Sequence, residues 1–371
     1  MERRLIVEQF DPDYPVPGGI DTCIRGLVKY CPPHIELSIV GVDAIGDKPI
    51  GKWSECYVGG RKIRFMPVVR LDHTDLTRRV PHSVRLALGL RRYRPMADAD
   101  VVQTHRINTG AVCLRLYRGA RHVQFIHSEG DLSTGSQSFF RHAVFTYRLL
   151  ERIVLTRSID TVIFSKSGAE RLQSISPRVR FSTTWYDPDE FFPADPETTR
   201  KTKIIWPYRV EPGKNPLLAI AIMSLLPEQY TLTVAGAGTM ESAMRAKALQ
   251  SPAANRITFL GAVPKAEIGA VMRRHHLMLM TSSFEGFSRA IVEGLASGLP
   301  VVTTSGGEPN GLVQSGANGS RVAGHEAQPF ISAVEIAAGI SASTCRDSVS
   351  ALRADLLVPN VLTIPASRVS G

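Results

Sequence analysis

The sequence has little cysteine and no long apolar run, and both shortages narrow the class of protein. Its five cysteines in 371 residues are scattered and odd in number, and none shows the paired spacing of a zinc site. This pattern predicts free thiols in a reducing compartment rather than a disulfide framework. No apolar stretch approaches the roughly 18 residues that a membrane-spanning helix needs. The first residues lead into a short predicted strand and not into the apolar core of a signal peptide, so we expect a cytoplasmic location.

Acidic residues are also in short supply. The chain has 34 Asp and Glu against 44 Lys and Arg, a net charge of +10. Most of this excess lies between Arg61 and Arg94, where ten basic residues face two aspartates, which gives a formal charge of +8. Such a stretch fits an anionic membrane surface, an anionic acceptor, or simply a solvated face. It has few aromatics for stacking on bases, which disfavours nucleic acid.

The side chains expected to make this contact on the acceptor or membrane side are Arg78, Arg79, Arg91 and Arg92. A membrane contact would place the protein at the inner face of the membrane.

Short apolar runs alternate with helical periodicity through both halves of the chain, which predicts an α/β protein of two doubly wound domains. The proline-rich and charged segment around residues 187–202 indicates an interdomain linker. We therefore predict an N-terminal Rossmann-like domain over 1–190, a linker over 191–202, a C-terminal Rossmann-like domain over 203–358 and a flexible tail over 359–371.

The stretch SSFEGFSRAIVEGLASGLPVV, residues 282–302, carries two glutamates among small and apolar residues. A buried strand is predicted before it at 277–280, a helix at 289–297 with Gly298 at its C-cap, and another strand at 299–304. Glu285 then falls in the loop ahead of the helix and Glu293 two turns into it. A carboxylate in apolar packing needs a partner, and open α/β sheets bind ligands at the carboxyl ends of their strands. The two glutamates are therefore candidate ligand contacts.

Other groups in the second half fit a phosphorylated ligand. Arg209 and Lys214 follow the strand predicted at 203–206, and two cations in such a loop suit a diphosphate. Gly236 and Gly238 allow a backbone to approach a ligand closely, and the helix that starts near Ser288 presents free N–H groups to an anion. With hydroxyl-binding carboxylates nearby, the set outlines a nucleotide sugar.

The spacing from Glu285 to Glu293, with Gly286 and Phe287 after the first glutamate and with Ala296, Gly298 and Pro300 beyond, resembles the E-x7-E element of retaining glycosyltransferases of family 4. Other blocks follow in the family's order: Gly18-Gly19, His127 after a strand, YRVEPGKN, VAGAGTM and ITFLGAVPKAEI. The resemblance covers most of residues 1–325. It implies a GT-B fold, in which two Rossmann-like domains face a central cleft that holds the donor.

The resemblance also implies roles for residues. Glu285 would bind hydroxyls of the transferred sugar and Glu293 the ribose, while Arg209 and Lys214 would stabilise the leaving diphosphate as a metal does elsewhere, so no metal or other cofactor is expected. Further implied donor contacts are Gly18, Gly19, Gly236, Gly238, Phe287, Ser288 and Arg289 near the phosphates, Val263 at the base and His127 beside the sugar. His105 is left as an acceptor-side or structural residue.

Two positions depart from the family's pattern. Thr183-Thr184-Trp185-Tyr186 stands where members often have Asn-Gly, and Ser288-Arg289 replaces a pair of small residues. The added Arg289 is a candidate contact to phosphate or acceptor. Both glutamates of the pair are present, which favours an active enzyme.

The resulting hypothesis is a hexosyltransferase that moves a sugar from a UDP- or GDP-activated donor to an acceptor hydroxyl with retention. The acceptor would be a cell-envelope glycan, a glycolipid or a secondary metabolite. The alternatives are a GT-B nucleotide-sugar epimerase or phosphorylase, and a non-catalytic nucleotide-sugar-binding homologue. An epimerase would need further acids in the cleft, which the sequence does not place.

Overall fold

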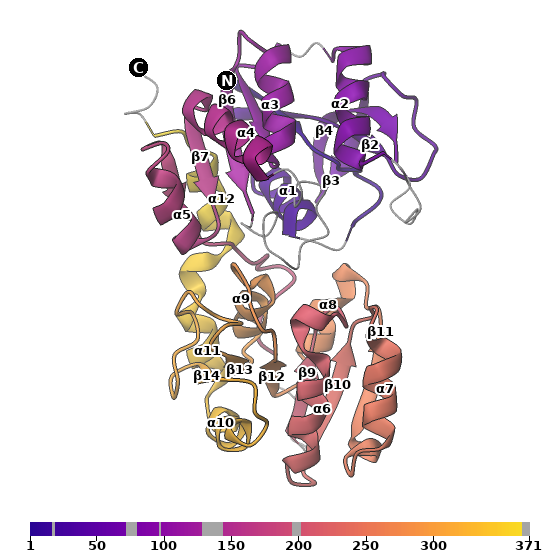
Figure 1. Ribbon diagram of the computed structural model, residues 1–371, viewed down its shortest axis with the longest axis vertical. Coiled ribbons are helices and arrows are strands. Elements are labelled where there is room, and N and C mark those ends of the chain that lie inside the picture. The colour runs from indigo at the N-terminus through magenta and orange to yellow at the C-terminus, as the bar shows by residue number, and fades with distance from the viewer. Residues whose placement is uncertain (17–18, 72–79, 96–97, 128–143, 195–201, 366–371) are drawn as a thin grey trace. The chain divides into compact units, whose positions relative to one another are not determined.

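The computed structural model describes residues 1–16, 19–71, 80–95, 98–127, 144–194 and 202–365 (Figure 1). By internal contacts the chain divides into two compact units, one of Met1–Thr183 with Val358–Gly371 and one of Thr184–Leu357. Three predicted contact residues, Gly18, Arg78 and Arg79, lie outside the described residues. Among the helices that are described, none is both long and apolar enough to cross a membrane.

The first unit contains an eight-stranded sheet in the order β3-β4-β2-β1-β5-β6-β7-β8, parallel throughout except for the antiparallel pair β3-β4. Its strands are β1 (Glu2–Val7), β2 (Ile35–Asp43), β3 (Ser54–Val58), β4 (Arg61–Arg70), β5 (Val101–Thr104), β6 (Arg121–Ile126), β7 (Asp160–Ile163) and β8 (Val179–Phe181). Its helices are α1 (Gly19–Lys29), α2 (His82–Tyr93), α3 (Ile107–Leu116), α4 (Val144–Arg157) and α5 (Lys166–Gln173). Inner strands such as β5 and β7 are buried along their whole length, as expected where helices cover both faces of a parallel sheet.

The second unit has a six-stranded parallel sheet in the order β11-β10-β9-β12-β13-β14. Its strands are β9 (Thr202–Trp206), β10 (Tyr230–Ala235), β11 (Ile257–Gly261), β12 (Leu277–Met280), β13 (Val301–Thr304) and β14 (Gly319–Val322). Its helices are α6 (Pro216–Leu225), α7 (Glu241–Leu249), α8 (Lys265–Met272), α9 (Arg289–Ala296), α10 (Pro329–Ala338), α11 (Ala342–Ser348) and the first part of α12 (Ala354–Leu362). The strand order reverses between β9 and β12, which makes their carboxyl ends the topological switch point of a Rossmann sheet.

The predicted α/β class is confirmed, and several elements fall where the sequence places them. The strands predicted at 230–235 and 277–280 have these bounds in the structure, and Gly298 follows α9 with a positive φ of 81°. The glycine lacks the Cβ that would strain this left-handed conformation, so it ends the helix as predicted.

The predicted flexible tail is wrong for its first residues, because Pro359 to Leu362 form the end of α12. Val361 and Leu362 are buried, and their carbonyl oxygens accept hydrogen bonds from Arg180 at 2.8 Å and Arg4 at 2.7 Å. Both arginines lie far away in the sequence, in β8 and β1, so local pattern gave no sign of this anchoring. By their contacts, the residues from Val358 onward belong to the first unit, and the second unit begins at Thr184, before the predicted linker.

Candidate active site

The switch point of the second unit brings two predicted site residues together. The loop after β9 ends in a short 3-10 turn (Pro212–Lys214), and the loop after β12 carries Glu285. Lys214 Nζ forms an ion pair with Glu285 Oε1, and Ser282 Oγ donates to the same carboxylate oxygen at 2.9 Å. The two charged side chains are 21% and 17% exposed, so the pair remains open to a ligand while most of its surface is enclosed.

The two loops that carry this pair are fixed to each other by hydrogen bonds. Thr281 Oγ1 donates to the carbonyl oxygen of Lys214 at 2.8 Å and accepts from Trp206 Nε1 at 2.9 Å. Ser283 N–H donates to Gly213 O at 3.0 Å. Because Trp206 is fully buried at the end of β9, the ammonium and the carboxylate are held by the core of the unit.

Tyr208 is a site residue that the sequence reasoning missed. Its ring lies under the Lys214 ammonium, 5.7 Å from centroid to nitrogen, and it is buried. Burial first, and then the charges of Glu285 and Glu293, hold the pKa of its phenol well above the usual value of 10. The phenol therefore keeps its proton at neutral pH. The available signal was its place beside Arg209, directly after a predicted strand.

Glu293 lies in the second turn of α9 with a side chain that is 14% exposed. Burial raises its pKa, while Arg289 and Lys265 oppose the shift and Glu190 adds to it. Its ion pair with Arg289 Nε is long, at 3.9 Å. Hydroxyl donors from a ligand would stabilise such a desolvated carboxylate, and the ribose contact expected of Glu293 stays a prediction.

The two departures from the family's pattern meet in space. Arg289 NH1 donates to Thr184 Oγ1 at 2.6 Å, and the Arg289 guanidinium lies 5.9 Å from the ring centroid of Trp185. The arginine at the start of α9 thus pairs with the segment that replaces Asn-Gly. Arg289 therefore interacts with residues of the second unit, and its expected contact with phosphate or acceptor stays a prediction.

The glycines after β10 have a packing role in the structure. A Cβ on Gly236 would lie 1.8 Å from Tyr208 O, and one on Gly238 would lie 2.4 Å from Val210 O. Glycine therefore allows the loops after β9 and β10 to touch, and donor contact by these two residues stays a prediction.

The remaining predicted donor contacts of the second unit lie in the loops after β9 and β12, except Val263, which follows β11. Arg209 is exposed, whereas Ser288 is buried and serves as the N-cap residue of α9. Phe287 and Val263 are partly buried against the core of the unit. Their contacts with phosphate and base stay predictions.

A third loop supports Glu285 and was not singled out from the sequence. It follows β13, where Gly306 O accepts from Glu285 N–H at 3.1 Å and Asn310 Nδ2 donates to Gly286 O at 2.9 Å. The signal was the run SGGEPNG directly after a predicted strand, because neighbouring parallel strands end at one edge of the sheet.

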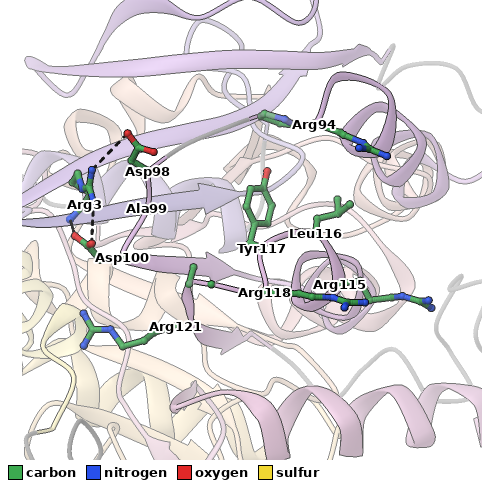
Figure 2. Close-up of a pocket in the computed structure, with 13 residues that line it drawn as sticks. Arg3, Arg94, Asp98, Ala99, Asp100, Arg115, Leu116, Tyr117, Arg118 and Arg121 are labelled. Carbon is green, nitrogen blue, oxygen red and sulfur yellow. Dashed lines mark hydrogen bonds and ion pairs between the residues drawn. The ribbon is translucent and has the colours of Figure 1, made fainter.

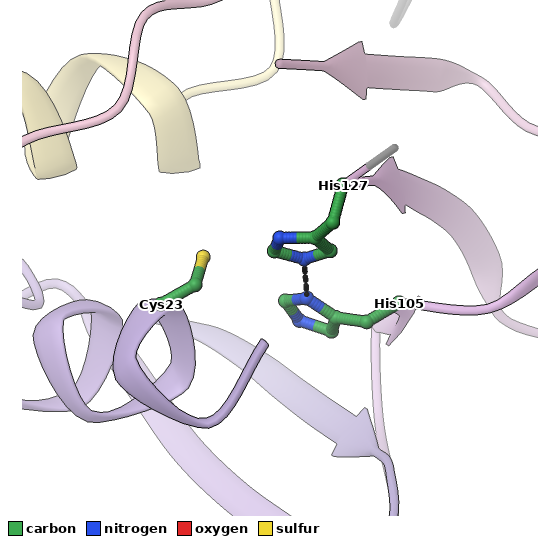
Figure 3. Close-up of side chains that lie close together, drawn as sticks. All are labelled: Cys23, His105 and His127. Atoms are coloured by element: carbon green, nitrogen blue, oxygen red, sulfur yellow. Dashed lines mark hydrogen bonds between the residues drawn. The ribbon is translucent and has the colours of Figure 1, made fainter. Parts of the chain in front are cut away.

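In the first unit the strand order reverses between β1 and β5, and the two predicted histidines follow β5 and β6. His105 Nδ1 and His127 Nε2 are 2.9 Å apart, with their rings stacked at 5.2 Å (Figure 3). His105 is 3% exposed, stacks on Phe125 and contacts Gln103 through Nε2 at 3.0 Å. Burial, with a smaller effect of Arg106, lowers the pKa of His105 to about 3. Such burial favours the structural role for His105, through which it orients the half-buried His127. Gly19 is the first residue of α1 at the same edge.

In the described part of the basic stretch, three cations of β4 have partners close by in the fold. On β4, Arg61 donates to the carbonyl oxygen of Cys31, Lys62 pairs with Glu55 at 2.7 Å and Arg70 pairs with Asp43 at 3.1 Å. By contrast, the arginines at the end of α2, Arg91, Arg92 and Arg94, are exposed.

A pocket of about 960 Å³ lies at the amino ends of β1, β5 and β6, which is the opposite edge of the sheet from the histidines (Figure 2). Arginines contribute much of its lining: Arg3, Arg94, Arg115, Arg118 and Arg121. Within it, the backbone N–H of Arg3 donates to Asp100 Oδ2 at 2.8 Å. Its position separates this pocket from the carboxyl-edge residues.

Part of the second unit matches the model of a known family. Residues 187–338 match the family model of glycosyl transferases group 1. A D-inositol 3-phosphate glycosyltransferase of Pseudarthrobacter chlorophenolicus is 25% identical over 348 residues, covering 86% of this chain and 81% of the relative.

Solved structures confirm the GT-B fold, with its two Rossmann-like α/β domains. Sucrose-phosphate synthase from Thermosynechococcus elongatus superposes with a TM-score of 0.77 at 16% identity, covering 97% of this chain and 98% of that one. HepE of Anabaena, in complex with UDP and glucose, superposes with a TM-score of 0.70 at 16% identity over 100% of both chains.

Proposed function

We propose that this chain, whose residues 187–338 match the family model of glycosyl transferases group 1, transfers a sugar from a UDP- or GDP-sugar to an acceptor hydroxyl with retention of configuration. The observation that carries the proposal is the Lys214–Glu285 pair at the switch point of the second sheet. It places an ammonium that binds phosphate beside a carboxylate that accepts hydrogen bonds from sugar hydroxyls, on loops that the core holds rigid.

In this proposal Lys214 and Glu285 separate and bind different parts of the donor. The Lys214 ammonium binds the diphosphate, while sugar hydroxyls donate to the Glu285 carboxylate and the ribose donates to Glu293. The bond from the anomeric carbon to the phosphate oxygen breaks as the acceptor oxygen bonds to the same face of that carbon. The acceptor proton passes to the leaving phosphate oxygen, and the Lys214 and Arg209 cations stabilise its negative charge without a metal ion.

The names of similar proteins guide the choice of substrates to test. HepE has been solved with UDP and with UDP-glucose, so UDP is the first nucleotide to test. The relative from Pseudarthrobacter is named for a phosphorylated polyol, which adds a phosphate-bearing acceptor to the glycan, glycolipid and secondary-metabolite classes.

Thermal-shift titration with UDP, GDP and ADP, first without metal and then with magnesium, tests the donor site. We expect one nucleotide to raise the melting temperature without metal, through a stabilisation of about 2.7 kcal/mol at 100 times its Kd. Lys214→Met should reduce the shift, and Lys247→Met, which neutralises an exposed lysine in α7, should leave it unchanged.

Two other outcomes separate the alternatives. No shift with any nucleotide, with or without magnesium, would contradict the proposed donor site. Epimerised donor in the absence of acceptor, seen by proton NMR, would identify an epimerase instead of a transferase.

We also propose that the face formed by α2, α3 and α4 contacts an anionic lipid bilayer. These helices lie side by side on the first unit (Figure 1). Their exposed cations, here called the arginine face, are Arg91, Arg92, Arg94, Arg115, Arg118, Arg148, Arg152 and Arg157. Between α2 and α3 lies a pocket of about 590 Å³ whose lining contains Arg91, Arg94, Arg115 and Arg118 and, among the described residues, no acidic side chain.

Large apolar side chains are exposed among these arginines. Leu88 of α2 is 61% exposed, and Phe145 and Leu149 of α4 are 83% and 51% exposed. Apolar side chains interspersed with cations suit the interface of an anionic membrane, where each Lys or Arg near the surface contributes about 1 kcal/mol.

Co-sedimentation with vesicles containing phosphatidylserine tests this contact. The parent should bind at low salt and lose binding as salt rises, and a variant with Arg91, Arg92, Arg115 and Arg152 changed to serine should bind at least ~100-fold more weakly. A control that removes exposed cations from the second unit, Lys247→Ser with Arg346→Ser, should bind as the parent does. Equal binding by both variants would contradict the arginine face, and tighter binding of an RNA probe would favour nucleic acid.

A further inference from the structure

Three metal-ligating side chains converge at the carboxyl edge of the first sheet. Cys23 comes from α1, His105 follows β5 and His127 follows β6. Figure 3 shows the Cys23 sulfur directed toward the stacked imidazoles. One potential ligand atom from each residue lies within 4.8 Å of the other two. The convergence is tertiary, since the three residues come from separate parts of the sequence.

The geometry is close to that of a zinc centre. With Zn–N distances of about 2.0–2.1 Å and a Zn–S distance of about 2.3 Å, neighbouring ligands in a tetrahedral site are roughly 3.3–3.7 Å apart. The two histidine nitrogens are 2.9 Å apart and need to separate by about half an ångström. The Cys23 sulfur lies within 4.8 Å of a nitrogen on each histidine and has to approach to about 3.5 Å.

Burial gives the cluster the form of a three-ligand site with one open position. Cys23 and His105 are 1% and 3% exposed, whereas His127 is half-buried. Phe125 and Phe164 pack on the two imidazole rings, with centroids 5.0 and 5.1 Å away, and orient them. Since the described residues supply three ligands, the fourth position of a tetrahedral site is left for water or another ligand.

The protons can be accounted for. With its amide as placed, Gln103 donates to His105 Nε2 at 3.0 Å, so His105 Nδ1 carries the hydrogen that it donates to His127. Metal binding moves this proton to Nε2, where a turned Gln103 amide accepts it at the cost of the hydrogen bond that its oxygen now accepts from Arg4 NH1 at 3.3 Å, and releases the thiol proton of Cys23 to solvent. No other proton or electron is transferred.

We propose that Cys23, His105 and His127 form a binding site for a borderline-soft divalent cation, with Zn²⁺ as the best match to two imidazoles and one thiolate. The bound metal occupies His127 and thereby inhibits sugar transfer. This consequence rests on the proposed function and on the place beside the sugar that the family resemblance implies for His127. In the proposed function the transfer itself needs no metal, so the site acts as an inhibitory switch.

Cobalt tests the binding without reference to activity. Co²⁺ added to the intact chain should give one equivalent of thiolate-to-metal charge-transfer absorption, which Zn²⁺ displaces. Cys23→Ser should abolish this band and weaken Zn²⁺ binding in equilibrium dialysis by at least ~10-fold. Cys56→Ser, a matched change in the same unit outside the cluster, should keep both. A band that persists in Cys23→Ser, or an absent band in the parent, would overturn the site.

Transfer assays then test the consequence. Zn²⁺ should inhibit the parent and Cys56→Ser, with recovery on chelation, while Cys23→Ser should be resistant and keep the parent's rate without metal. If Co²⁺ and Zn²⁺ bind as stated but transfer is unaffected, the inhibitory role and the placement of His127 beside the sugar are both wrong. If transfer is never detected but the band appears, the metal site is supported and the proposed function fails.

Discussion

The Glu285→Gln variant is expected to lose transfer by a factor of about 10² to 10³ while binding nucleotide about as well as the parent. Glutamine keeps the size of the side chain but cannot accept the sugar hydroxyls as a carboxylate does. It also breaks the ion pair with Lys214 and weakens the hydrogen bond from Ser282. Because the diphosphate still has Lys214 and Arg209, the loss should appear in kcat. Initial rates and nucleotide titration measure the two quantities separately.

Contact between the two side chains makes a second measurement informative. Groups that touch and act together lose catalysis non-additively, so Lys214→Met with Glu285→Gln should be little worse than the poorer single variant. Glu241→Gln, a matched change at a surface ion pair of α7, should leave the rate unchanged. Transfer by Glu285→Gln near the parent rate would refute the role of Glu285, and full additivity would show that the pair does not act as a unit.

The arrangement of the second unit could be predicted well because its signals are local. Short apolar runs mark β10 and β12, and a glycine that must take a positive φ marks the end of α9. A parallel sheet then places the loops after β9 and β12 at one edge, which is why Lys214 and Glu285 could be assigned to one site. Their direct pairing could not be predicted, because it depends on side-chain packing around Trp206 and Thr281.

Long-range contacts explain what the sequence could not show. The sequence offered Arg289 only as an added candidate contact to phosphate or acceptor, and the fold shows that it pairs with Thr184, which belongs to the other departure. The end of α12 appeared to be a loose tail because its anchors, Arg4 and Arg180, are remote in sequence. Cys23 gave no signal as a metal ligand, since it lacks a nearby cysteine or histidine at metal-binding spacing.

Charge counting predicted the amount of positive charge but not its distribution. The arginines of β4 interact with neighbouring residues, whereas Arg148 and Arg152 of α4 add to the face formed by α2 and α3. Grouping the charges by their proximity in sequence was misleading, because β4 and α2 of this stretch lie in different layers of the unit.

Acid should destabilise the second unit through His275. The sequence shows two adjacent histidines here, and only the fold shows that His275 is buried. His275 is 7% exposed, with Nδ1–H donating to Val271 O and Nε2 accepting from the Thr233 hydroxyl, both at 2.8 Å. Burial lowers its pKa to about 4, helped by nearby cationic groups and opposed by the bond to Val271. These cationic neighbours are Lys203, Arg274 and His276.

The sign follows from proton uptake. An unfolded histidine takes up its proton near pH 6.5, whereas folded His275 does so only near pH 4, so the unfolded chain binds more protons between these values. The free energy of unfolding should therefore fall as the pH drops from 6.5 to 4, by about 3 kcal/mol for this group. Urea unfolding followed by tryptophan fluorescence reports on this unit through Trp185 and Trp206. His275→Gln should flatten the decline by about that amount and His325→Gln, at an exposed position, should not. Equal slopes for parent and His275→Gln would show that the buried imidazole protonates without resistance.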